Sequence, residues 1–429
     1  MAAPVRVGLL GCGNVGSAIV RLLDEHADRI AGRAGANLEV TRVVVRDVTR
    51  ARDVKLAPER FTTDAASVVE GSDIDIIVEV IGGVEPAGSL IRRALEAGKP
   101  VVTANKELIA QRGPELFETA GRAGVDLLFE ASVAGGIPLM RPLRESLAGD
   151  RIERVTGIVN GTTNYILTRM TELGTSFADA LAEAQRQGFA EPDPSADIGG
   201  QDAAAKAAII ATIAFGARVH ADDVHTEGIS DITDDDIASA RMLGYVIKLL
   251  AVAEEVGGDI AVRVHPAMVP LQHPLATVRD SFNAVLIEGE AVGELMLYGR
   301  GAGPGPTASA VLGDLVDAAR NLVAGAKGAT IGGLVDRPIR PIGELESQFY
   351  LLIEVADRPG VLAAIAAEFG RHEVSIQSMD QRGLGADARL VFITHSSREA
   401  DVRATLDALR SVEPVHRVGS VIRVLGDVG

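Results

Sequence analysis

Residues 5–16 read VRVGLLGCGNVG, and this stretch decides the fold of the first part of the chain. Val5 to Leu10 is a short apolar run with a bias toward β-branched residues, which predicts a buried strand. The run 11–16 follows at once, and residues 17–23 have the spacing of a helix. The order strand, G-x-G-x-x-G, helix is the pattern of a Rossmann-type dinucleotide-binding unit.

Each glycine of this turn has a physical reason to be there. Gly11 allows the tight turn, Gly13 lets the backbone approach a pyrophosphate, and Gly16 lets the helix pack closely. The amino end of the helix adds a partial positive charge for the phosphates. We therefore predict that the turn binds a dinucleotide through five residues: Gly11, Gly13, Asn14, Val15 and Gly16.

The next predicted strand, 39–45, ends in Arg46-Asp47, where the two nicotinamide cofactors are told apart. An acidic residue at this strand end holds the ribose hydroxyls of NAD, whereas an arginine accepts the 2′-phosphate of NADP. Arg46 comes first and further basic residues follow at positions 50, 52 and 55, which favours NADP. NAD stays open, and so does a solvated loop with ordinary charges.

Two later strands of this domain end in candidate site residues. Strand 101–103 runs into Ala104-Asn105-Lys106, and ligands bind beyond the carboxyl ends of such strands. Lys106 therefore lies where a nicotinamide or a substrate is expected, the alternative being a solvated helix cap. Strand 126–130 ends in the loop 131–138, in which Gly135 and Gly136 can expose backbone carbonyls around a cavity or a cation.

The second informative stretch is acidic and stiffened by proline, GFAEPDP at 188–194, and it continues through Asp197 into GQDAAAK at 200–206. The alanine-rich helix carries Asp202 and Lys206 one turn apart, so both project from one face. Apolar neighbours surround Lys206, where the charge of a lysine is adjustable. Carboxylates and an amine suit a substrate with an ammonium at one end and a hydroxyl or carbonyl at the other. The alternative is a surface ion pair.

The rest of the chain is organised into further parts. Residues 151–299 are predicted to form an α+β substrate domain with a mostly antiparallel sheet, in which Asp234 to Asp236 cap a helix. The glycine–proline loop 299–307 opens a helix to about residue 323 and can return the chain to the first domain, or serve as a stiff connection. After a linker, residues 349–424 have the order βαββαβ of a ferredoxin-like module. We expect this module to serve in regulation or association rather than in chemistry.

Composition narrows the function classes. The chain has 429 residues, too many for one ordinary core, with 42 basic and 59 acidic side chains and no tryptophan. Nucleic-acid binding is not expected, because phosphate-neutralising charge and stacking rings are both missing. Cys12 is the single cysteine, which fits a reducing compartment, and no apolar run approaches the ~20 residues of a membrane span. We expect a soluble cytoplasmic protein without a signal peptide.

These motifs together resemble homoserine dehydrogenases along the first 325 residues or so, with an ACT-type regulatory domain behind. The matching stretches are GCGNVG at 11–16, TANK at 103–106, NGTTNY at 160–165, the acidic stretch 188–206 and, for the ACT domain, DRPGV at 357–361. The resemblance implies three domains and a linker: a Rossmann domain 1–138 completed by 300–325, an α+β catalytic and dimerisation domain 139–299, the linker 326–347 and an ACT domain 348–429.

The resemblance also implies an activity, the reversible interconversion of L-homoserine and L-aspartate 4-semialdehyde with NAD or NADP in amino-acid biosynthesis. Lys206 is then the acid–base group at the substrate 4-oxygen, and Lys106 lies by nicotinamide and substrate. Glu191 and Asp202 hold the substrate. By the same resemblance, Gly188 and Gly303 approach the cofactor. The family binds a sodium-like cation at the positions of Glu130, Val133, Gly135 and Ile137.

Regulation and assembly follow from the ACT domain. We expect feedback by an amino acid, threonine before others, and a homodimer or homotetramer, because ACT ligand sites usually form between two modules. Two other functions are less compatible with the residues. A semialdehyde dehydrogenase that forms an acyl phosphate needs a thiol nucleophile, and Cys12 lies inside the glycine turn. A non-catalytic sensor of a dinucleotide and an amino acid needs no acid–base lysine.

Overall fold

The computed structural model describes residues 3–328, 331, 333–383 and 388–426. The chain divides into two compact units. Unit 1 consists of Met1–Val155, Ala205–Asp223 and Asn283–Arg337, and unit 2 consists of Thr156–Ala204, Val224–Phe282 and Pro338–Gly429. Three elements contain a boundary between these segments: β7 (Ile152–Ile158), α9 (Gln201–Phe215) and β11 (Phe282–Gly289).

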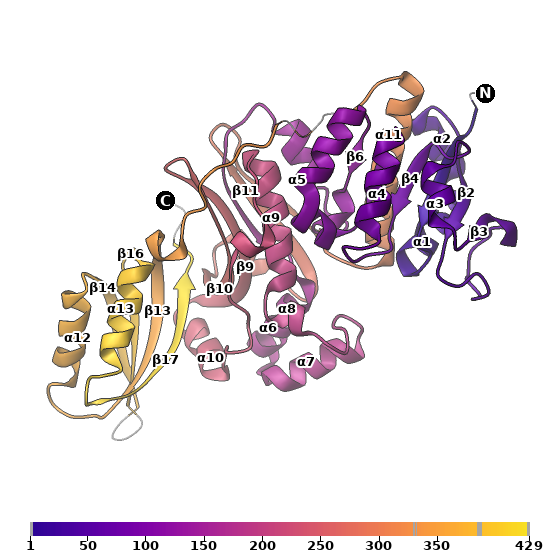
Figure 1. Cartoon of the computed structure of the whole chain (residues 1–429). Helices are drawn as coiled ribbons and strands as arrows, with labels where there is room; N and C mark the ends of the chain where they lie inside the picture. The colour runs from indigo at the N-terminus through magenta and orange to yellow at the C-terminus, as the bar shows by residue number, and fades with distance from the viewer. Residues whose placement is uncertain (1–2, 329–330, 332, 384–387, 427–429) are drawn as a thin grey trace. The chain divides into compact units, whose positions relative to one another are not determined.

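Unit 1 is built on a six-stranded parallel sheet with the strand order β3-β2-β1-β4-β5-β6 (Figure 1). This order is that of a dinucleotide-binding Rossmann sheet, as the sequence predicts. Its strands are β1 (Val5–Leu10), β2 (Leu38–Val44), β3 (Phe61–Thr62), β4 (Ile76–Glu79), β5 (Val101–Thr103) and β6 (Leu127–Leu128). Its helices are α1 (Asn14–Glu25), α2 (Ala27–Ala34), α3 (Ala65–Glu70), α4 (Ala87–Glu96) and α5 (Lys106–Ala123), with short 3-10 turns at Pro58–Arg60 and Glu130–Ser132.

The last long helix of unit 1, α11 (Pro304–Ala324), returns to this sheet. Gly303 precedes it with φ +114°, a left-handed backbone that favours glycine, and prolines occupy its first turn. Val311 and Leu315 share one apolar core with Leu9 of β1 and Ile19 of α1. Unit 1 also holds a π-helical turn, Pro142–Ser146, a 3-10 turn, Ala221–Asp223, and the strand β12 (Gly293–Arg300).

Unit 2 contains two twelve-residue strands, β9 (Tyr245–Val256) and β10 (Asp259–Pro270), paired antiparallel along their whole length. Around them are β8 (His225–Thr226), α6 (Gly161–Leu173), α7 (Phe177–Arg186), α8 (Ser195–Ile198), α10 (Asp234–Met242) and a 3-10 turn, Pro274–Thr277. The three aspartates predicted to cap a helix form the first turn of α10. The N-cap itself is Thr233, and of the aspartates only Asp236 takes part, in a reciprocal capping box with Thr233.

The C-terminal part of unit 2 has the βαββαβ order predicted for an ACT domain. Its elements are β13 (Glu346–Val355), α12 (Val361–Arg371), β14 (Ile376–Arg382), β15 (Ala388–Thr394), β16 (Ser397–Arg398), α13 (Glu399–Leu409) and β17 (Val415–Val424), after a 3-10 turn at Ile342–Glu344. Strands β17-β13-β15-β14 are antiparallel neighbours, and the helices α12 and α13 lie beside them (Figure 1). Ile365 of α12 and Leu406 of α13 belong to the apolar core of this domain.

The ACT sheet continues into the strands that precede it in unit 2. The end of β17 pairs in parallel with β10, with Arg423 opposite Ala267, and the nitrogen of Leu425 donates to the carbonyl of Met268. The strands β9-β10-β17-β13-β15-β14 therefore form one hydrogen-bonded series. Within the described ranges, no helix is both long and apolar enough to cross a membrane.

Candidate functional site

The glycine turn of unit 1 has the geometry that its sequence predicts. Gly11 follows β1 with φ +101°, and a Cβ there would meet the carbonyl oxygen of Val80 at 2.8 Å. A Cβ at Gly16 would meet the carbonyl oxygen of Gly11 at 2.3 Å, so glycine is needed for helix α1 to come this close. A Cβ at Gly13 would meet no atom within 4 Å. The turn thus leaves open space at the start of α1, beside Asn14 and Val15, as a pyrophosphate requires.

At the carboxyl end of β2, the acidic residue Asp47 is engaged in hydrogen bonds, whereas the basic residue Arg46 is exposed. Asp47 uses its carboxylate within its own loop, accepting hydrogen bonds from the nitrogen and the hydroxyl of Thr49 at 2.8 and 2.6 Å. These bonds hold the pKa of Asp47 below its ordinary value. Arg52 also folds onto this loop, donating to the carbonyl of Asp47 at 2.8 Å. Arg46 is exposed at the strand end, in the place where a 2′-phosphate is bound in such sheets.

A buried carboxylate organises the neighbouring ends of β4 and β5. Glu79 accepts hydrogen bonds from the nitrogens of Ile81 and Gly82 and from the hydroxyl of Thr103. Asn105 donates to the carbonyl of Gly83 at 2.7 Å and caps α5 by accepting from the nitrogen of Leu108. Lys106 is therefore fixed as the first residue of α5, exposed at the same edge of the sheet as the glycine turn.

Glu130 lies at the end of β6, where a sodium-like cation is expected. Its carboxylate accepts hydrogen bonds from the nitrogens of Leu139, Met140 and Arg141 at 2.5–2.8 Å. Its own nitrogen donates to Asp314, a carboxyl of α11 that is 3% exposed. The Glu130 carboxylate is thus committed to the turn that opens at residue 139, and a cation here would rely on backbone carbonyls.

The loop after Glu130 packs against the chain that leads into α11. Ala134 and Gly135 are both left-handed, with φ of 56° and 55°, and a Cβ at Gly135 would meet the carbonyl of Gly301 at 2.2 Å. Gly136 donates to the carbonyl of Arg300 at 3.0 Å. Val133 and Ile137 are buried on either side. The backbone of 133–137 is therefore held close to the loop that carries Gly303.

Unit 2 gathers the acidic stretch around one asparagine. The side-chain nitrogen of Asn160 donates to Asp197 at 2.7 Å and to Asp202 at 2.9 Å, while its oxygen caps α6 by accepting from Thr163. Two carboxylates from different turns of the chain thus share one donor. Gly188, with φ +76°, and Glu191 are both exposed at the start of the stretch. Glu191 is anchored through its carbonyl, which accepts from Gln185 at 3.2 Å.

Helix α9 carries the two central residues of the prediction. Asp202 is 8% and Lys206 9% exposed, so this pair is not the solvated surface pair of the alternative interpretation. The residues around Lys206 are buried and apolar: Ala203, Ala207, Ile209 and Ile210. The structure thus confirms that Lys206 is largely removed from bulk water.

Two features of unit 2 go beyond the sequence prediction. The sequence identifies Asn160 as part of a polar turn, but its partners at 197 and 202 follow only from the fold. Lys248, in the middle of β9, is 2% exposed and donates to the side-chain oxygen of Asn164 at 2.9 Å. A lysine inside the apolar run 245–253 is the signal that could have found it, because a buried charge needs polar partners.

Models of known families match nearly the whole chain. "Homoserine dehydrogenase, NAD binding domain" matches residues 11–130, "Homoserine dehydrogenase" matches 138–316 and "ACT domain" matches 349–414. Homoserine dehydrogenase from Mycobacterium tuberculosis is 51% identical over 434 residues, covering 99% of this chain and 98% of that protein. The enzyme from Corynebacterium glutamicum is 49% identical, covering 99% of this chain and 96% of that protein.

Solved structures that are similar to this chain are also homoserine dehydrogenases. A homoserine dehydrogenase from Thiobacillus denitrificans has a TM-score of 0.93 at 42% identity, covering 99% of this chain and 98% of that one. A hyperthermophilic archaeal homoserine dehydrogenase mutant in complex with NADPH has a TM-score of 0.64 at 31% identity, covering 74% of this chain and 98% of that one. With these matches over full-length relatives, the chain belongs to the homoserine dehydrogenase family, with a C-terminal ACT domain.

Proposed function

We propose that this chain interconverts L-homoserine and L-aspartate 4-semialdehyde with NADP preferred over NAD, and that Lys206 is its acid–base group. The observation that carries the proposal is on α9. Lys206 is nine-tenths buried on a helix whose neighbouring residues are buried and apolar, one turn from Asp202, whose carboxylate is fixed by Asn160. Removing an amine from water is costly, so such a position favours a functional group over an ordinary surface charge.

The residues divide the chemistry as follows. A bound nicotinamide accepts the hydride in the oxidative direction and returns it in the reductive one. Lys206 takes the proton of the substrate hydroxyl, or donates it to the developing alkoxide, help typically worth ~10²–10⁴ in rate. Glu191 and Asp202 bind the α-ammonium of the substrate. Lys106, at the carboxyl edge of the parallel sheet, adds a positive charge beside the reacting carbon.

Replacement of Lys206 tests the proposal. We expect Lys206→Met to lower kcat by roughly 10²–10⁴ while NADPH still binds, as followed by its fluorescence. Lys99→Met is the matched control, since Lys99 is also buried but precedes β5, at the opposite edge of the sheet from Lys106. Near-normal turnover of Lys206→Met, with the control also active, would exclude the assigned role.

The preference for NADP is supported by the engagement of Asp47 with Thr49 and by the exposure of Arg46. Arg46→Ala should raise KM for NADP about 10–100-fold, the value of charge-assisted hydrogen bonds to one phosphate, and leave KM for NAD nearly unchanged. Equal effects on both cofactors would assign Arg46 to the solvated loop instead. We propose that Gly188 and Gly303 approach this cofactor together with the glycine turn.

A semialdehyde dehydrogenase is disfavoured by the state of its one possible nucleophile. Cys12 is buried, and burial raises the pKa of its thiol, whereas a nucleophilic thiol needs a lowered one. A sensor without turnover is separated from an enzyme by following NADPH oxidation with aspartate semialdehyde as the substrate.

We propose a monovalent cation, sodium in the first place, at the backbone carbonyls of Glu130, Val133, Gly135 and Ile137. The commitment of the Glu130 carboxylate to three nitrogens supports a neutral carbonyl site, which suits an ion of single charge. The measurement is cofactor affinity in sodium and in a bulky organic cation at equal ionic strength. Equal affinities would remove the ion from the site.

The ACT domain supports feedback by an amino acid, and we propose threonine, acting in a cytoplasmic homodimer or homotetramer. The domain limits proposed are those of the sequence, 1–138 with 300–325, 139–299, 326–347 and 348–429. The test is inhibition by millimolar threonine together with the mass of the assembly by light scattering. An unchanged rate at saturating threonine would leave the ACT domain with a role in assembly only.

A further inference from the structure

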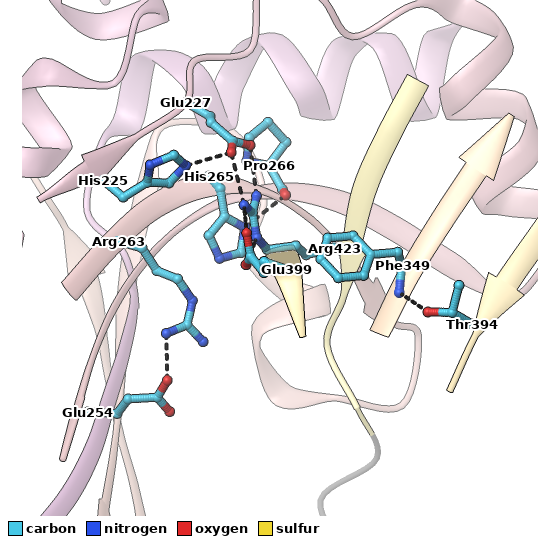
Figure 2. Close-up of polar contacts among 10 residues, drawn as sticks. All are labelled: His225, Glu227, Glu254, Arg263, His265, Pro266, Phe349, Thr394, Glu399 and Arg423. Atoms are coloured by element: carbon cyan, nitrogen blue, oxygen red, sulfur yellow. Dashed lines mark hydrogen bonds and ion pairs between the residues drawn. The ribbon is translucent and has the colours of Figure 1, made fainter. Parts of the chain in front are cut away.

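Arg423, near the end of the ACT domain, is the centre of a buried ionic cluster. Its guanidinium donates four hydrogen bonds, two to Glu227 at 2.7 and 2.9 Å and two to Glu399 at 2.6 and 2.7 Å (Figure 2). Arg423 is 6% exposed and its guanidinium lies 5.8 Å from the centre of the Phe349 ring. Glu399 belongs to the ACT domain, whereas Glu227 follows β8 in the preceding part of unit 2.

Titratable groups from several elements surround this cluster. Burial raises the pKa of the Glu227 carboxyl, but hydrogen bonds from His225 and Arg423 outweigh it and hold that pKa well below its ordinary value. His265 is buried beside the cluster, and burial lowers its pKa, so this histidine adds no positive charge. Arg263, the other arginine nearby, is paired with Glu254 (Figure 2). Arg423 is therefore the cation that Glu227 and Glu399 share, one positive charge bonded to two carboxylates.

Glu227 belongs to a segment that is fixed on both sides. Its nitrogen donates to the carbonyl of Val264 in β10 at 2.8 Å. Two residues later, the nitrogen of Ile229 donates to the carbonyl of Ile198 at 2.8 Å. Between them, Gly228 lies so close to α8 that a Cβ would meet the Ile198 oxygen at 2.2 Å. Residues 227–229 thus connect the Arg423 cluster with the backbone of 198–200.

That backbone leads directly into the acidic stretch. Gly200, with φ +90°, is packed so that a Cβ would meet Thr226 at 2.9 Å and the carbonyl of Glu227 at 3.2 Å. Asp197 comes shortly before this contact and Asp202 shortly after it, and both accept from Asn160. Any displacement of 227–229 therefore moves the turn between the two carboxylates.

We propose that Arg423 is a positioning residue for the carboxylates of the acidic stretch, Asp197 and Asp202. Arg423, on the last strand of the ACT domain, holds Glu227, and the segment 227–229 in turn fixes the turn between these two aspartates. The ACT domain then contributes to substrate affinity even without an effector. Because Arg423 of β17 makes the contact with Glu227, a movement of β17 is expected to displace the acidic stretch before other parts of the substrate site. The proposal rests on the proposed role of Asp202 in binding homoserine.

Steady-state kinetics of the full chain test this role. Arg423→Met is expected to raise KM for homoserine about tenfold while KM for NADP and kcat stay within about threefold, since binding of one substrate alone is weakened. Glu227→Ala should give the same change, and Glu227→Gln, which keeps an acceptor oxygen, should restore most of the affinity. The double variant Arg423→Met/Glu227→Ala should be no worse than either single one, because both remove the same contact.

Two further variants separate positioning from folding. Gly228→Ala leaves the ion cluster intact but forces the segment away from Ile198, and should reproduce the rise in KM for homoserine. Two controls test this. Arg417 lies on the same strand as Arg423 and pairs with Glu354 inside the ACT domain, and Arg417→Met removes that ion pair. Gly343→Ala adds a Cβ whose nearest contact, at 3.6 Å, is an ordinary one. Both controls should leave KM unchanged.

The outcomes distinguish the inference from the function on which it rests. If Asp202→Asn raises KM for homoserine but Glu227→Ala and Gly228→Ala do not, the positioning role is wrong and the substrate role stands. If Asp202→Asn also has no effect, the substrate role itself fails. Equal rises in KM for homoserine and NADP in folded Arg423→Met protein would reduce the arginine to a structural contact.

Discussion

Two ionic clusters of this chain contain the same ingredients, an arginine and two carboxyl groups, yet shift a carboxyl pKa in opposite directions. In unit 2, Glu227 receives two hydrogen bonds from Arg423 and one from His225, and its pKa is lowered. In unit 1, burial raises the pKa of Asp314 to about 7. Asp314 has one bond from Arg141, at 3.0 Å, and one from the neutral nitrogen of Glu130.

The difference lies in burial, in the number of charged donors and in the neighbouring negative charge. The Glu227 side chain is 37% exposed, whereas that of Asp314 is 4% exposed. Arg423 aims its whole guanidinium at two carboxylates, so desolvation of each is offset. Arg141 is partly exposed and divides its charge between Asp314 and Asp317, while the negative Glu130 lies beside Asp314. The partly exposed Glu227 therefore stays ionised beside charged, bidentate donors, whereas the buried Asp314, with fewer charged donors, tends to take up a proton.

The largest expected effect is the loss of the arginine from the fully paired cluster. Arg423→Met leaves Glu227 and Glu399 without their cation, and breaking a buried pair in this way costs about 3–5 kcal/mol. We expect the free energy of unfolding, from urea titration at pH 7.5, to fall by that amount. Arg417, on the same strand, forms a more exposed pair with Glu354 of β13, and Arg417→Met should cost no more than about 1 kcal/mol.

A small loss in Arg423→Met would contradict the account of that cluster. It would mean that water or a rearranged side chain replaces the arginine, and that the two clusters differ less than their hydrogen bonds suggest.

The second prediction concerns pH and Asp314. The pKa of Asp314 is about 7 in the fold and 3.8 as its ordinary value, so between these values the folded chain binds more protons than the unfolded one. The contribution of Asp314 to stability is complete below pH 3.8 and is lost as pH rises through 7. Between about pH 5 and pH 8 the loss is roughly 2–3 kcal/mol. Asp314→Asn should abolish this part of the pH dependence.

Asp317→Asn is the matched control, because Asp317 contacts the same arginine from the same helix. Unfolding curves at pH 5 and pH 8 for the three proteins give the comparison. If Asp314→Asn retains the full pH dependence, the proton belongs to another group and the contrast between the clusters disappears.

Local contacts of this chain are easier to predict from its sequence than contacts between distant residues. The glycine turn, the helix start at Asp234 to Asp236 and the order of the ACT elements are set within a few residues, so their patterns are sufficient to predict them. The acidic stretch is likewise visible as a site, and the burial of Lys206 is expected from its apolar neighbours.

Contacts between distant residues are not predictable in this way. Arg423 meets Glu227 across 196 residues and Asn160 meets Asp202 across 42, and each pairing depends on how strands and helices are arranged, for which a single sequence holds no signal. The role of the Glu130 carboxylate escapes prediction for a related reason. Its partners are the backbone nitrogens of 139–141, and every residue type except proline offers such a donor.

The smallest predicted effect extends the comparison to a buried cation without a charged partner in contact. Lys248 donates to the side-chain oxygen of Asn164 and the carbonyl of Val278, both neutral, and burial lowers its pKa from 10.5 to about 8. Between these values the unfolded chain binds more protons, so the stability contribution of Lys248 rises with pH, by about 1.4 kcal/mol from pH 7 to pH 9. Lys248→Met should remove this rise, whereas Lys55→Met, at an exposed lysine paired with Asp24, should not. An unchanged pH dependence in Lys248→Met would show that two neutral oxygens are enough to keep a buried lysine charged.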